Sequence, residues 1–206
     1  MADSPRPLPT ARRVRELRPG DELGIWTLGP TPDQFEKLAA TNSKWRAVAG
    51  HLFAAAEKLW PEIEAAFVIH ADDPDDATAA EGLRLRGPCY LLIGLAFENL
   101  AKAVVVARKN RQNQPITNGE VLYFGSKHDV LRFVSDAGVP LQDLDVELLT
   151  QLGRFVEWQG RYPVPRRGRR LGHNTVTGTS DMRRFKNLFA RLESEYLRVI
   201  ATPANG

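Results

Sequence analysis

The feature that most constrains this chain is a long apolar segment at residues 87–110, GPCYLLIGLAFENLAKAVVVARKN. Its apolar residues recur at helical spacing, and the segment is longer than strands in globular proteins usually are. The stripe consists of Tyr90, Ile93, Phe97, Leu100, Ala101 and Val104, widened by Leu91, Leu95 and Val105. Basic residues gather at its end, where they suit the negative end of a helix dipole. The pattern predicts a central, largely buried helix.

Four further helices are expected around it. TPDQFEKLAA starts one at residue 31, with Thr31 as the N-cap, and this helix should run into the fifties until Pro61 kinks it or starts a new first turn. Apolar residues at helical spacing and cap residues predict the others over residues 126–138, 140–160 and 179–200. We therefore expect an all-α fold, a bundle of about five to six helices.

Two parts of unequal size are predicted along the chain. Residues 1–30 contain many arginines and prolines and form an N-terminal arm that is partly irregular, whereas residues 31–206 form a single helical domain. Within the arm, only ELGIWTLG hints at a short extended piece.

Composition narrows the class of protein further. Of 206 residues, 43% are hydrophobic and 26% are charged, which is typical of an ordinary globular chain. The single cysteine, Cys89, excludes an intrachain disulfide and a multi-cysteine zinc site, and it favours a reducing compartment such as the cytoplasm. Because residues 88–107 include Glu98, Asn99 and Lys102, we expect no membrane span. The opening residues do not have the pattern of a secretory signal.

An arginine-rich segment is the most informative stretch for function. Residues 160–173 read GRYPVPRRGRRLGH, with arginines at Arg161, Arg166, Arg167, Arg169 and Arg170. Arginine side chains suit phosphate, and the two prolines limit the ordering cost on binding. Trp158 and Tyr162 add aromatic surface on which the bases of single-stranded RNA could stack. A solvated connection between helices is the alternative.

Two smaller polar groups complete the candidate site. Glu98 and Lys102 lie four residues apart in the most apolar helix, so they share a face and can form an ion pair, either at the rim of the core or as the polar floor of a site. His128 and Asp129 fall in the expected first turn of a helix, where an anion is favoured. His128 is either a general base, a phosphate contact or a simple packing residue.

The order of these motifs resembles the HEPN superfamily of compact helical bundles, found in bacterial toxins, antiviral defence proteins and RNA-processing factors. The likeness covers about residues 88–200 and rests on GLAFENLAKAVVVA, KHDVLRFV and LLTQLGRFVEWQGRYPVP. It is carried by Glu98 with Lys102, by His128 with Asp129, and by the Arg161-Tyr162-Pro163 step. The resemblance implies a bundle of four or five helices that commonly dimerises and, in many members, a metal-independent ribonuclease.

Active members use an arginine followed four to six residues later by a histidine. Arg167 precedes His173 with five residues between them, and Arg166 precedes it with six, although neither arginine is followed by the usual Asn, Asp or His. The resemblance then implies that His173 handles the proton of an attacking 2′-OH. Arg167 or Arg161 would stabilise charge on phosphorus, without metal or other cofactor.

The sequence therefore predicts a HEPN-like protein that associates with RNA or a nucleotide-bearing ligand, in bacterial defence or in a toxin and antitoxin pair. It would act as a homodimer or with a protein partner. One alternative is a non-enzymatic protein–protein interaction module. A second is an active metal-independent endoribonuclease.

Overall fold

The computed structural model describes residues 37–116, 128–159 and 180–202. By its internal contacts the chain divides into two units, Met1–Phe35 and Glu36–Gly206, and every described residue belongs to the second. The predicted boundary near residue 30 lies outside the described residues.

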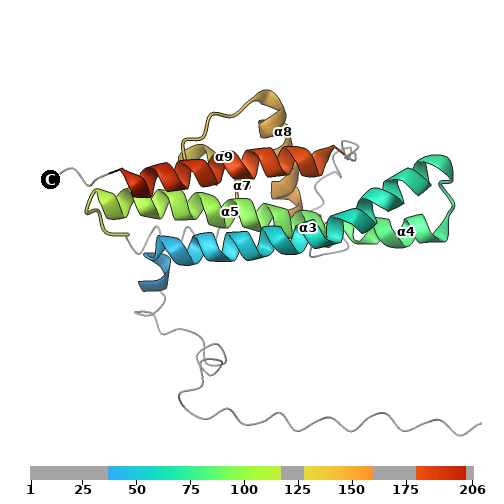
Figure 1. Ribbon diagram of the computed structural model, residues 1–206, viewed down its shortest axis with the longest axis horizontal. Helices are drawn as coiled ribbons and strands as arrows, with labels where there is room; N and C mark the ends of the chain where they lie inside the picture. Colours follow the sequence, from blue (N-terminus) through green and yellow to red (C-terminus); the bar gives the residue numbers. More distant parts are fainter. Residues whose placement is uncertain (1–36, 117–127, 160–179, 203–206) are drawn as a thin grey trace, which may run out of the picture. The chain divides into compact units, whose positions relative to one another are not determined.

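Every regular element in the described ranges is helical, which confirms the expected all-α bundle (Figure 1). The α-helices are α3 (Asn42–Asp72), α4 (Ala77–Arg84), α5 (Arg86–Arg111), α7 (Val130–Asp136), α8 (Asp143–Arg154) and α9 (Asp181–Ala201). A π-helical turn, η1 (Phe155–Gln159), continues α8.

Helix α5 is the centre of this bundle, as its periodicity predicts. It contacts all five of the other α-helices and η1. The predicted stripe is buried, and the residues that widen it are partly buried. The stretch Ala77–Arg111 is the one helical segment in the described ranges that is long and apolar enough to cross a membrane, and 72% of its most apolar window is buried inside the bundle. Its apolar character is therefore that of a bundle core.

The long helices pack side by side with defined directions (Figure 1). At one end Cys89 Sγ of α5 lies 3.5 Å from the Ala56 carbonyl oxygen of α3, and at the other Asn110 Nδ2 donates to the Ala40 carbonyl oxygen at 3.0 Å. Helix α3 is thus antiparallel to α5. Helix α9 runs parallel to α5, because Asp181 meets the start of α5 and Glu195 meets its last turns.

The first long helix begins later than expected. Residues 37–39 are helical, but the chain turns at Ala40, and Thr41 is extended, so α3 begins only at Asn42. Of the two outcomes expected at Pro61, a new first turn is not seen, because α3 continues through Pro61 to Asp72. Figure 1 shows the axis of α3 turning in its second half, which fits the expected kink. A proline removes a single backbone donor, a loss that a long helix packed on both sides of it tolerates.

Helix α4 is an element that the sequence patterns did not predict. Its N-cap is Asp76, whose carboxylate accepts from Thr78 N at 2.7 Å and from Ala79 N at 3.1 Å. These backbone hydrogen bonds, first from Ala79 and then from Thr78, lower the pKa of Asp76 below its ordinary value. The acidic run at residues 72–76 therefore ends in a helix cap.

Helix α7 is shorter than expected and ends as expected. Its N-cap is Asp129, which accepts from Arg132 N at 3.0 Å, whereas the predicted cap Ser126 lies outside the described residues. At the other end Gly138 has φ +69, the left-handed conformation predicted for it. A Cβ at Gly138 would lie 3.0 Å from Arg108 Nη2, so glycine also lets Arg108 approach.

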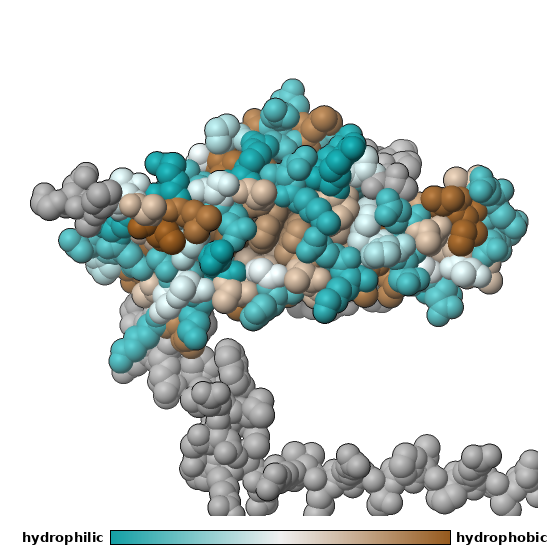
Figure 2. All heavy atoms as spheres, in the orientation of Figure 1, coloured by the Kyte–Doolittle hydropathy of each residue, from teal (hydrophilic) through white to brown (hydrophobic). Residues whose placement is uncertain are grey.

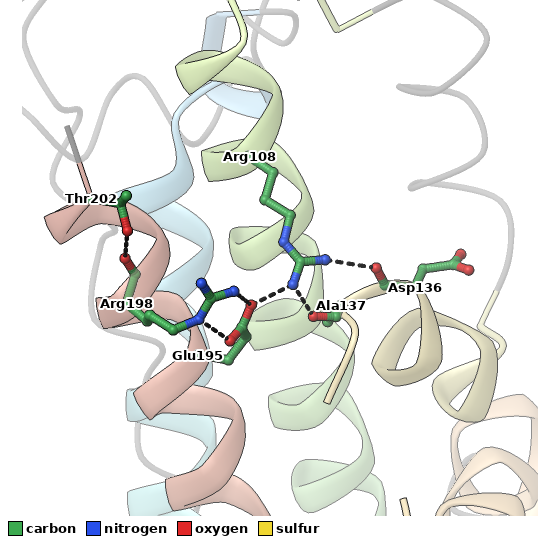
Figure 3. Close-up of polar contacts among 6 residues, drawn as sticks. All are labelled: Arg108, Asp136, Ala137, Glu195, Arg198 and Thr202. Atoms are coloured by element: carbon green, nitrogen blue, oxygen red, sulfur yellow. Dashed lines mark hydrogen bonds and ion pairs between the residues drawn. The ribbon is translucent and has the colours of Figure 1, made fainter. Parts of the chain in front are cut away.

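Arg108 joins three helices through this approach (Figure 3). Its guanidinium, on α5, donates to the carbonyl oxygens of Asp136 at 3.2 Å and Ala137 at 2.7 Å, the last carbonyls of α7. It also pairs with Glu195 of α9, which accepts two further hydrogen bonds from Arg198, each 2.7 Å long. The pair therefore fixes α7 and α9 to the carboxyl end of α5.

Candidate functional site

Most of the predicted ligand-binding and catalytic side chains lie outside the described residues. These are Arg161, Tyr162, Arg166, Arg167, Arg169, Arg170 and His173. Trp158 belongs to the π-helical turn η1. The catalytic pairing of Arg167 with His173 thus stays a prediction, and the geometry that bears on it is that of the helices on either side of residues 160–179.

The two flanking elements, η1 and α9, both contact Tyr90, in the second turn of α5. The Tyr90 hydroxyl lies 3.0 Å from Asp181 Oδ2, in the first turn of α9. Its ring centroid lies 4.9 Å from that of Phe155, the first residue of η1, and 5.5 Å from that of Phe185. The chain therefore leaves η1 and enters α9 at the same end of the bundle, beside the start of α5.

The guanidinium of Arg86 lies at the same place. Arg86 packs over the rings of Tyr90 and Phe155, at 5.5 and 5.9 Å from their centroids. Its Nε and Nη2 atoms are buried and form no hydrogen bond within the described parts of the chain. A buried donor without an acceptor is costly, so an anion that supplied oxygen atoms here would be bound favourably.

Exposed arginines surround this end of the bundle. Arg154 ends α8, and Arg183 and Arg184 lie in the first turn of α9. All three are exposed, and none forms an ion pair with another described residue. Lys186, one residue further along, differs because its Nζ pairs with Glu57 Oε1 at 2.9 Å. The charges of these three arginines are therefore not offset by an ion pair within the described ranges.

Two turns further along α5 lies a buried polar cluster. Glu98 and Lys102 are 2% and 3% exposed, and Glu98 Oε1 accepts a hydrogen bond from Lys102 Nζ, so the ion pair expected from their spacing is present. The other carboxylate oxygen, Oε2, lies 3.1 Å from His128 Nδ1. The Lys102 ammonium lies over the rings of Phe133 and Trp45, at 4.8 and 5.2 Å from their centroids.

Within this cluster, burial acts on the ammonium group of Lys102. Desolvation lowers the pKa of Lys102, and the charge and hydrogen bond of the Glu98 carboxylate oppose that shift. His128 is the partly exposed member of the cluster: 31% of its side chain is exposed, and its Nδ1 faces the buried Glu98 carboxylate. The arrangement is an ion pair in the core with one histidine at the surface.

The structure separates His128 and Asp129, which the sequence grouped together. His128 was expected in the first turn of a helix, as a general base, a phosphate contact or a packing residue. It instead precedes the N-cap of α7, and its Nδ1 faces Glu98. Asp129 is exposed and caps α7, so it does not join the polar cluster. A cap one turn later than predicted moves both side chains to new positions.

Sequence reasoning missed Arg86, Tyr90 and Asp181. Tyr90 was counted only as part of an apolar stripe, and no spacing rule connects its hydroxyl to a carboxylate 91 residues away. The sequence LRLRGP does place two arginines just before the central helix, and that was the available signal.

Within the described ranges, no group of three or more His, Cys, Asp or Glu residues could hold a metal ion. Comparison with known proteins gives no match: no protein-family model, no curated protein and no solved structure matches the chain. The HEPN resemblance therefore depends on the sequence motifs alone.

Proposed function

We propose that this protein binds RNA, or a nucleotide-bearing ligand, at the end of the bundle where η1, α5 and α9 meet. The observation that carries the proposal is the convergence of those helices on Tyr90 beside Arg86. In the sequence, the arginine-rich residues 160–173 directly follow η1, and Arg183 and Arg184 follow at the start of α9.

Electrostatics favours a polyanion as the ligand. Guanidinium groups bind phosphate oxygens in a bidentate manner, and several of them along one surface release counterions from a nucleic acid backbone. Single-stranded RNA fits better than a duplex, since Trp158 and Tyr162 lie next to the arginines in sequence and exposed bases stack on aromatic rings. The HEPN resemblance supports the same class of ligand, and a role in bacterial defence or in a toxin and antitoxin pair belongs to the same proposal.

The test compares two double variants that remove equal charge. Arg183→Gln with Arg184→Gln removes two exposed cations at the proposed interface, and Lys37→Gln with Lys44→Gln removes two exposed cations near the start of α3, by the far end of α5. Fluorescence anisotropy with a labelled single-stranded RNA should show affinity about tenfold weaker for the arginine variant at low salt. The lysine variant should bind like the unmodified protein.

Two results would remove the proposal: no RNA binding at about 50 mM salt, or equal weakening in both double variants. The same preparation tests for cleavage. Cyclic-phosphate ends formed in EDTA by the unmodified protein, and not by His173→Ala, would establish the endoribonuclease alternative on top of binding.

A further inference from the structure

Residues 62–85 form a second charged surface, which we call the acidic hairpin: the last part of α3, the connection at residues 73–76, and α4. The two helices pack closely because Gly82 has no side chain. A Cβ there would lie 2.6 Å from Ala66 Cβ and 3.0 Å from the Glu62 carbonyl oxygen. Beside this contact lies a groove of about 440 Å³ whose apolar lining includes Ala65, Ala66, Ile69 and Leu85, with Glu62 and Glu81 among its polar lining residues.

The acidic hairpin is mostly negative, with Arg84 at the end of α4 as its one Lys or Arg residue. Residues 59–83 contain seven Asp and Glu residues and neither Lys nor Arg. Asp73 and Asp76 are engaged with backbone N–H groups of the connection and of α4. Glu62, Glu64, Asp72 and Glu81 are exposed and form no ion pair with a described residue. The two carboxylates that line the groove, Glu62 and Glu81, are therefore not paired with a cation of the described ranges.

Apolar surface accompanies this charge. Val68 is 55% exposed, the second most exposed of the large hydrophobic residues in the described ranges. Figure 2 shows hydrophobic atoms gathered on the hairpin, with hydrophilic residues around them. An exposed apolar patch rimmed by charge is typical of an interaction site.

We propose that the groove of the acidic hairpin binds a partner protein through a basic amphipathic segment. Apolar side chains of that segment would enter the groove over Ala65 and Ile69, and its Lys or Arg residues would meet Glu62 and Glu81. The carboxylates repel phosphate, so this surface does not suit the RNA that we assign to the arginines. The inference thus adds a protein partner to the proposed function and does not depend on it.

A designed peptide of about four helical turns provides the probe, with leucines on one face and lysines on the other. The full chain should bind it in fluorescence anisotropy. It should not bind the matched peptides in which serine replaces leucine or glutamate replaces lysine. Loss with either replacement would show that the site requires apolar and cationic groups together.

Two arginine substitutions on the hairpin locate the site. Ala65→Arg places a bulky cation in the groove at an exposed position, and it should weaken binding at least about tenfold. Ala80→Arg adds the same charge on α4 outside the groove lining, and binding should stay within about twofold. Glu62→Gln with Glu81→Gln should also weaken binding, without changing the helical circular dichroism.

Several outcomes would overturn the inference. They are no binding of the leucine and lysine peptide, equal loss in Ala65→Arg and Ala80→Arg, or undiminished binding of the serine peptide. Sedimentation that revealed a dimer broken by Ala65→Arg alone would assign the groove to a second copy of this chain instead.

Discussion

Glu98 is the most deeply buried charged residue in the described ranges, and its carboxylate lies in the core between Lys102 and His128. A buried ion pair adds little net stability, but removal of one partner leaves a charge without compensation. This asymmetry makes the pair a sensitive probe of the core.

Lys102→Met should lower the free energy of unfolding by about 3 kcal/mol, because the Glu98 carboxylate keeps only His128 as a partner. Combining it with Glu98→Gln removes the charge as well, so the double variant should be more stable than Lys102→Met alone. Urea denaturation followed by circular dichroism measures both. Additive losses in the double variant would contradict the coupling of the two side chains.

Cys89 gives a chemical test of the core beside α3. Burial raises the pKa of its thiol to about 12, so the thiol stays protonated near neutral pH. We expect no reaction with Ellman's reagent in the folded protein at pH 8, and complete reaction in denaturant. Rapid reaction of the folded protein would show that the contact between α3 and α5 opens.

The lowered pKa of Glu195 predicts how the free energy of unfolding changes at acidic pH. Hydrogen bonds from Arg198 and then from Arg108 lower its pKa from the ordinary 4.5, so the folded state binds this proton less readily than the unfolded state. The contribution of Glu195 is therefore complete above pH 4.5 and is lost as pH falls through the lowered pKa. In Glu195→Gln, stability should fall less steeply between about pH 5 and pH 3, and curves of identical slope would contradict this account.

At the scale of helices, the close packing of α5 against α8 and η1 depends on Gly94. A Cβ at Gly94 would overlap Val156 Cγ2 and lie 3.3 Å from the Leu152 carbonyl oxygen. A Cβ at Gly153, in α8, would have no neighbouring atom within 4 Å. The two glycines thus form a matched pair for substitution.

Gly94→Ala should destabilise the fold by about 1–3 kcal/mol, because the helices must move apart. Gly153→Ala should stabilise it by about 0.5–1 kcal/mol, since alanine favours a helix where nothing obstructs it. Thermal denaturation of both variants provides the comparison. A loss of stability in Gly153→Ala, or none in Gly94→Ala, would mean that the helices pack differently.

The elements that could be predicted from the sequence are long segments in which apolar residues recur at helical spacing. Helix α5 is such a segment. The end of α7 was also predictable, because Gly138 follows it where the backbone takes a left-handed conformation. Helix α4 could not be found this way because its eight residues are too few for a clear period, so only the Asp76 cap indicates it. The extended Thr41 also has no local signal.

The candidate site was predictable in part for the same reason. The Glu98 and Lys102 pair follows from the fixed spacing of one helix, whereas His128 approaches from another element. Contacts such as that between Tyr90 and Asp181 depend on how the helices pack, which no local pattern encodes.

For the whole molecule, two surfaces of opposite charge follow from the described residues. Arg154, Arg183 and Arg184 are exposed where η1, α5 and α9 meet, and the acidic hairpin carries uncompensated carboxylates beside an apolar groove. In our proposals RNA binds the first surface and a basic protein segment binds the second. This division of ligands is what a single binding protein would need to connect an RNA with a protein partner.

The dependence of RNA affinity on salt tests the central claim most directly. If several arginines contact phosphates, the logarithm of the association constant should fall linearly with the logarithm of salt concentration, with a slope of about −3 or steeper. Arg183→Gln with Arg184→Gln should reduce that slope by about 2, because each lost phosphate contact removes about 1. A flat dependence, or a slope that these two substitutions leave unchanged, would contradict the proposed interface.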